Sequence, residues 1–136
     1  MTIDIRQAVL RANAVFLLAA STGGMWSDIT GAFFGRGHVA PILAGAPHAA
    51  IGFVEAHGLA FIIGVLLWRA EPSRAWHMTA AAVHVLLGTS NLVFWQIFVA
   101  ADMLTVGYAT TILHWSFVAV QSAAALTYGQ ARPRSA

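Results

Sequence analysis

Four long apolar stretches constrain this chain more than any other feature of its sequence. They cover residues 8–25, 49–68, 76–99 and 103–128, and each is close to the roughly 20 residues that an α-helix needs to cross a bilayer. Charged residues make up 9% of the 136-residue chain, against roughly a quarter in soluble domains. The sequence therefore predicts an all-α integral membrane protein, an up-down bundle of four transmembrane helices in a single domain, residues 1–136.

The longest connection between these stretches, residues 27–48, is rich in Gly and Pro. Pro41 and Pro47 argue against a continuous helix there. We therefore expect an outer loop, which either lies at the membrane interface or dips into the bilayer as a re-entrant turn. Asp28 falls at the start of this segment and is interpreted as an acid of the loop or of a helix cap.

The placement of the arginines predicts the orientation in the membrane. With the N-terminus inside, Arg36 is the only arginine in an outer segment, and all others fall in inner segments. The inner arginines are Arg6, Arg11, Arg69, Arg74, Arg132 and Arg134. Both termini are therefore expected in the cytoplasm. A composition rich in Ala and Arg without Lys is typical of a GC-rich bacterium, so we expect the bacterial cytoplasmic (inner) membrane.

A weak internal repeat relates the two halves of the chain. The segment LRANAVFLLAASTGGMW, residues 10–26, aligns without gaps with MTAAAVHVLLGTSNLVF, residues 78–94. The alignment places Phe16 opposite His84, and His57 and His114 match as midpoints of the second and fourth stretches. This pattern is compatible with a two-helix tandem repeat.

Polar residues recur at helical spacing within the apolar stretches. In residues 76–99, His77, Ala81, His84, Gly88, Asn91 and Trp95 follow one another at intervals of four and three, which places them on one helical face. The predicted polar seam of the bundle contains Asn13, Glu55 or His57, His84, Asn91, His114 and Gln121. His38, His48 and His77 are interpreted as interfacial residues.

Three histidines are expected at the same membrane depth. Counted from the middle of their stretches, His57, His84 and His114 lie within roughly 5 Å of the bilayer midplane, and Glu55 lies slightly further out. Ionisable groups at this depth are costly, so they indicate a candidate ligand site.

Two chemical uses of this site remain open beside a structural one. The first is an electron-transfer protein with haem b, the leading cofactor candidate, for which His57 and His114 are the best pair of axial ligands. The second is a metal site formed by His57, His84, His114 and Glu55, or a Glu/His pair acting as a membrane enzyme on a lipid-like substrate.

The favoured hypothesis is a non-catalytic binding or accessory-subunit role. In it, the buried polar residues hydrogen-bond the helices together, and the apolar faces pack against lipids, a larger membrane complex or further copies of the chain. The absence of cysteine excludes disulfides and thiolate metal ligands. The net charge of +2 is too small to suggest a nucleic-acid partner.

Overall fold

The computed structural model describes residues 2–127. This part of the chain consists of helices and turns without a strand, which confirms the all-α prediction. Residue 128, the last of the expected fourth stretch, and the two arginines after it lie outside the described residues. The helices are α1 (Ile3–Phe34), α2 (Ala40–Gly45), α3 (Ala49–Arg69), α4 (Arg74–Val93), α5 (Trp95–Ala100) and α6 (Leu104–Leu126).

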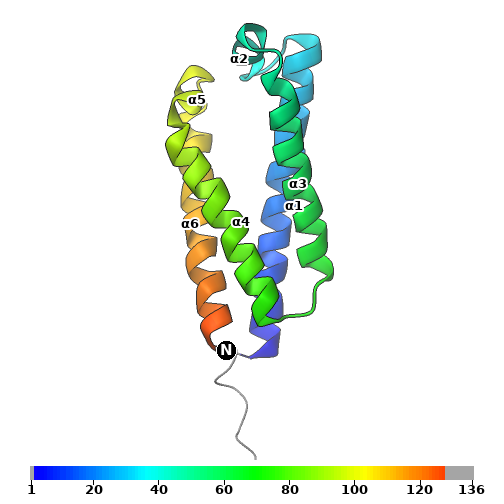
Figure 1. Ribbon diagram of the computed structural model, residues 1–136, viewed down its shortest axis with the longest axis vertical. Coiled ribbons are helices and arrows are strands. Elements are labelled where there is room, and N and C mark those ends of the chain that lie inside the picture. The colour runs from blue at the N-terminus through cyan, green and yellow to red at the C-terminus, as the bar shows by residue number, and fades with distance from the viewer. Residues whose placement is uncertain (1, 128–136) are drawn as a thin grey trace, which may run out of the picture.

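The long helices form two antiparallel hairpins. Helix α1 packs along α3, and α4 packs along α6, while the short helices α2 and α5 lie at the tips of the hairpins (Figure 1). The two hairpins are close together near the N-terminus and diverge toward α2 and α5 (Figure 1). Both halves of the chain have the same order of elements, long helix, short helix, long helix, which is the arrangement that a two-helix repeat requires.

Helix α1 is longer than the first apolar stretch. The Thr2 hydroxyl accepts a hydrogen bond from Ile5 N–H at its start, and Gly35, with a φ of 60°, ends it in the left-handed conformation. The expected outer loop, residues 27–48, is therefore helical over residues 27–34 and again over α2. The reason is that the first proline of this segment occurs only at position 41. Gly31 is buried where α1 meets α2, and a Cβ there would lie 2.8 Å from Val39 Cγ2.

The third apolar stretch, expected as one helix over residues 76–99, is divided at Phe94 into α4 and α5. Phe98 of α5 packs against Gly107 of α6, where a Cβ would lie 2.8 Å from Phe98 Cγ. Three of the described helices, α1, α3 and α6, are long and apolar enough to cross a membrane. Helix α4 spans 20 residues and is not among them, because it carries the polar stripe with His77 and His84.

The interior of the bundle is polar at many positions, and its exterior is apolar. The buried polar residues are Arg6, Asn13, Ser21, Asp28, His77, His84, Thr111, His114 and Gln121. A small apolar cluster around Leu10, Leu17 and Leu67 packs α1 against α3. Large apolar side chains such as Ile51, Val85 and Ile112 are exposed on the outer faces of α3, α4 and α6. The polar groups that carry chemistry therefore lie between the helices.

Candidate functional site

A chain of hydrogen bonds crosses α4, α6 and α1 in the interior. His77 Nδ1 lies 2.5 Å from Gln121 Oε1, and Gln121 Nε2 donates to Asn13 Oδ1 over 2.9 Å. Asn13 Nδ2 lies 2.5 Å from His84 Nε2, and His84 Nδ1 lies 2.8 Å from His114 Nδ1. All five side chains are buried. The sequence prediction of a polar seam thus includes four residues that do meet in the structure, Asn13, His84, His114 and Gln121.

With the Asn13 and Gln121 amides oriented as they are in the structure, the partners in this chain assign the proton of each imidazole to one nitrogen. The Asn13 amide nitrogen can only donate, so His84 Nε2 accepts and the neutral His84 ring carries its proton on Nδ1. His84 Nδ1–H then donates to His114 Nδ1, which leaves the proton of neutral His114 on Nε2. At the other end, the Gln121 carbonyl oxygen accepts from His77 Nδ1–H. The chain therefore has one direction and ends in an N–H group on His114.

Aromatic packing holds the two central imidazoles in place. His84 stacks on Phe117 with a centroid distance of 4.9 Å and an interplanar angle of 16°. Phe16 lies against His84 at 5.9 Å and against His114 at 5.4 Å. Phe16 and His84 occupy equivalent positions in the weak repeat, and the structure brings them into contact between the two hairpins.

His77, which was interpreted as an interfacial residue, lies inside the bundle. Its side chain has no exposed surface, and Nε2 is buried without a hydrogen-bond partner among residues 2–127. The signal that could have found it is the stripe of residues 76–99, because His77 lies one helical repeat before His84 on the same face.

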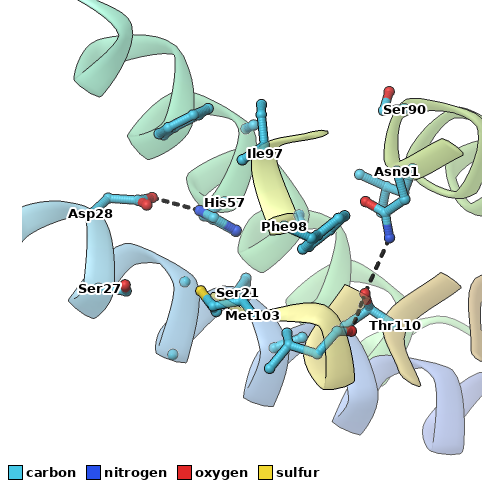
Figure 2. A pocket seen from close by; sticks show the side chains of 18 of the residues that line it. Ser21, Ser27, Asp28, His57, Ser90, Asn91, Ile97, Phe98, Met103 and Thr110 are labelled. Carbon is cyan, nitrogen blue, oxygen red and sulfur yellow. Dashed lines mark hydrogen bonds and ion pairs between the residues drawn. The ribbon is translucent and has the colours of Figure 1, made fainter. Parts of the chain in front are cut away.

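A second pair joins α1 to α3 at a different level of the bundle. His57 Nδ1 lies 2.6 Å from Asp28 Oδ2, with the Asp28 side chain 3% exposed and the His57 side chain 38% exposed. Figure 2 shows the second ring nitrogen of His57, Nε2, turned away from Asp28. Sequence reasoning missed Asp28 because it was assigned to a loop. If the first helix continues past residue 27, Asp28 lies four residues after Gly24 and therefore on the same helical face, and this spacing could have identified it.

Gly24 makes the position of His57 possible. A Cβ at residue 24 would overlap His57 Nε2, Cδ2 and Cε1, the last at 2.6 Å. Because three ring atoms are almost equally close, the Cβ would stand over the face of the ring rather than at its edge. The imidazole therefore lies flat on α1, and the in-plane direction from Nε2 is not blocked by Gly24.

A cavity of about 630 Å³ lies between the two hairpins. Side chains from α1, α3, α4, α5 and α6 line it, and most are apolar, among them Leu17, Phe53 and Phe98. Polar groups enter it at a few points, including the Asp28–His57 pair shown in Figure 2, and His114. Two separate polar clusters, the hydrogen-bonded chain and the pair on α1 and α3, thus reach one cavity.

Asn91, another residue of the predicted seam, also lies on the cavity wall. Its amide nitrogen donates to Thr110 Oγ1 over 3.1 Å (Figure 2) and to Thr111 Oγ1 over 3.2 Å, which ties α4 to α6. Both amide protons are used in these bonds, so the Asn91 carbonyl oxygen is the part of this side chain left for other contacts.

His57 and His114 were expected at one depth, and the structure separates them along the bundle. His114 packs on Phe16, whereas His57 lies on Gly24, and these two positions of α1 are about 12 Å apart along the helix axis. One metal ion bound by both rings needs nitrogen atoms about 4 Å apart, since each metal–nitrogen bond is about 2 Å long. Depth was counted from the middle of each stretch, but the α1–α3 hairpin is displaced along the bundle axis relative to α4–α6.

The other candidate ligands are also apart. Both nitrogens of His84 are already hydrogen-bonded. Glu55 is exposed on the outer face of α3, beside Gly58 and Ile62 in a shallow depression. Within residues 2–127, no three His, Asp or Glu side chains are arranged to hold a metal ion. The structure therefore does not bring His57, His84, His114 and Glu55 together.

Comparison with protein-family models, with curated proteins and with solved structures finds no match for this chain. The function therefore has to be argued from the cavity and from the two polar clusters that reach it.

Proposed function

We propose that this chain is a small membrane-embedded binding protein that holds a largely apolar molecule, without catalysis, in the cavity between its two hairpins. The observation that carries the proposal is the cavity itself. Its volume of about 630 Å³ lies within the roughly 300–1,000 Å³ of small-molecule sites. Its lining is mainly apolar with a few convergent polar groups, which is the composition of such sites.

The distribution of side chains supports a membrane location. Three helices have the length and composition of membrane spans. We include α4 as the fourth, because its polar stripe is buried within the bundle while Met78, Val85 and Leu92 are exposed on its outer side. The arginine distribution favours both termini in the cytoplasm of a bacterium with the protein in the inner membrane.

The separation of His57 from His114 argues against the haem hypothesis in its two-histidine form. An absorption spectrum of the purified protein, before and after dithionite, tests it directly, because a haem gives an intense band that shifts on reduction.

The accessory-subunit role stays a prediction, and a pull-down from native membranes addresses it.

Photolabelling with benzophenone tests the proposed binding site. Excited benzophenone inserts into C–H bonds and favours methionine, and the chain has Met103 in the cavity lining and Met78 on the lipid side of α4. In lipid nanodiscs we expect Met103 to be labelled, as mapped by peptide mass spectrometry. Ala20 lines the cavity, so Ala20→Phe should fill part of it and suppress labelling at Met103.

Ala12→Phe is the matched control, because Ala12 is an exposed residue of the same helix that does not line the cavity. It should leave labelling at Met103 unchanged. Met78 reports probe dissolved in the surrounding lipid and should be labelled equally in all three proteins. Labelling of Met103 that Ala20→Phe does not reduce would refute the proposal.

A further inference from the structure

The two histidines that reach the cavity differ in how their protons are held, and each can be assigned from its partners. For His114 the assignment follows from the hydrogen-bonded chain. Its Nδ1 accepts from His84, so the group left for the cavity is Nε2–H. This nitrogen forms no hydrogen bond within residues 2–127. One end of the cavity therefore presents a donor.

For His57 the assignment follows from charge. Asp28 is buried, and His57 Nδ1 is its hydrogen-bond partner among the described side chains. Because a net negative charge is disfavoured away from water, we take the pair as neutral overall. Two neutral arrangements place the shared proton between Nδ1 and Oδ2 and leave no acid O–H on Oδ1: a carboxylate with an imidazolium, or a carboxylic acid donating from Oδ2 to the Nδ1 of a neutral ring. In both arrangements Nε2 carries a proton, so this end of the cavity also presents a donor.

The remaining polar groups on the cavity wall do not change this pattern at its ends. The Ser21 and Thr110 hydroxyls donate to backbone carbonyls of their own helices. The Ser27 and Ser90 hydroxyls either donate or accept and so discriminate little between ligands. The Asn91 carbonyl oxygen belongs to a residue of the cavity wall and is an acceptor. The positions of α1 that the two rings contact, Phe16 for His114 and Gly24 for His57, are about 12 Å apart along the helix axis, and most of the cavity lining is apolar.

We propose that the cavity selects a rigid, elongated, apolar molecule that carries a carbonyl oxygen at each end, one bound by His114 Nε2–H and the other by His57 Nε2–H. Asp28 acts as a positioning residue, since it holds the His57 ring and keeps the donor directed away from α1. This inference rests on the proposed function, because it names the class of molecule that the same cavity would hold.

A series of steroid probes with one skeleton and different carbonyl counts tests the inference. The probes are 5α-androstane, 5α-androstan-3-one, 5α-androstan-17-one and 5α-androstane-3,17-dione, in tritiated form. Binding is measured to the full chain in lipid nanodiscs, with partition into empty nanodiscs subtracted. Without donors in the cavity, each added carbonyl should weaken binding, because its desolvation is not compensated. We expect the opposite order, with the dione at least tenfold tighter than androstane.

Variants at each end locate the source of this preference. The double variant Asp28→Leu/His57→Phe removes both partners of the pair, so no buried charge is left behind. It should lower the affinity for the dione about tenfold and leave the affinity for androstane unchanged. His114→Phe should do the same through the other end. Glu55→Gln, on the outer face of α3 two residues from His57, should change neither affinity.

The outcomes separate the inference from the proposed function. If all four probes bind alike and Ala20→Phe abolishes their binding, the cavity is a binding site and the inference is overturned. A dione preference that persists in both histidine variants overturns it as well. If Ala20→Phe changes the binding of none of the probes, the proposed function fails, and the inference fails with it.

Discussion

Replacing Asn13 with Leu should destabilise the bundle strongly, because Asn13 links α1 to both α4 and α6. The variant removes the bonds to Gln121 and His84 and leaves the Gln121 amide N–H and His84 Nε2 buried without partners. The two lost hydrogen bonds, at the membrane-protein average of about 0.6 kcal/mol each, set a lower bound of about 1.2 kcal/mol on the decrease in the free energy of unfolding. Two unsatisfied buried groups at about 1–3 kcal/mol each set an upper bound near 6 kcal/mol. Leucine regains some of this through apolar packing, so we expect a loss of about 2–4 kcal/mol.

The assay is equilibrium unfolding in mixed micelles titrated with dodecyl sulfate and followed by tryptophan fluorescence. Gln96→Leu is the control, since Gln96 is an exposed amide of α5 and its loss should change the free energy of unfolding by less than about 0.5 kcal/mol. The double variant Asn13→Leu/Gln121→Leu should cost less than the sum of the single variants, because both singles remove the same bond. An Asn13→Leu effect no larger than the control, or strict additivity in the double variant, would refute the reasoning.

Two further predictions concern the His57 position and the orientation of the chain. Gly24→Ala should displace the His57 ring and lower the free energy of unfolding by about 1–3 kcal/mol through overpacking. The control Gly23→Ala should be neutral or slightly stabilising, because a Cβ at residue 23 meets no atom within 4 Å. Equal effects of the two variants in the same unfolding assay would contradict the packing of His57 on Gly24. Because the chain has no cysteine, single-cysteine variants report topology: Arg36→Cys should react with a membrane-impermeant maleimide in intact cells, and Glu71→Cys only after permeabilisation. The reverse pattern would overturn the predicted orientation.

The helices and much of the polar seam could be predicted because both depend on periodicity along one helix. The spacing of His77, His84 and Asn91 places them on one face of α4 whatever the partners are. Apolar surroundings then require that this face meet protein. Residue types alone therefore predicted that Asn13 and Gln121 belong to the same seam.

The hydrogen-bond partners could not be predicted, since they depend on how far one hairpin is shifted along the other. His57 and His114 lie near the middle of their own helices, yet the positions of α1 that they contact, Gly24 and Phe16, are about 12 Å apart along the helix axis. The Asp28–His57 pair was missed for a related reason. Composition around Pro41 suggested a loop from residue 27, whereas local helix formation continued to Phe34 and placed Asp28 in the interior.

What the sequence by itself determined is the class of protein and the location of its polar groups between the helices. Long apolar stretches have to form helices in lipid, because every backbone N–H and C=O must be satisfied within the segment. Only the tertiary structure decided that the hairpins diverge, that a cavity opens between them and that two separate histidines reach it. These features depend on close contacts between helices, such as the His57 ring on Gly24 and Phe98 on Gly107. Such contacts depend on the shape of the space between side chains distant in sequence, which periodicity within one helix does not encode.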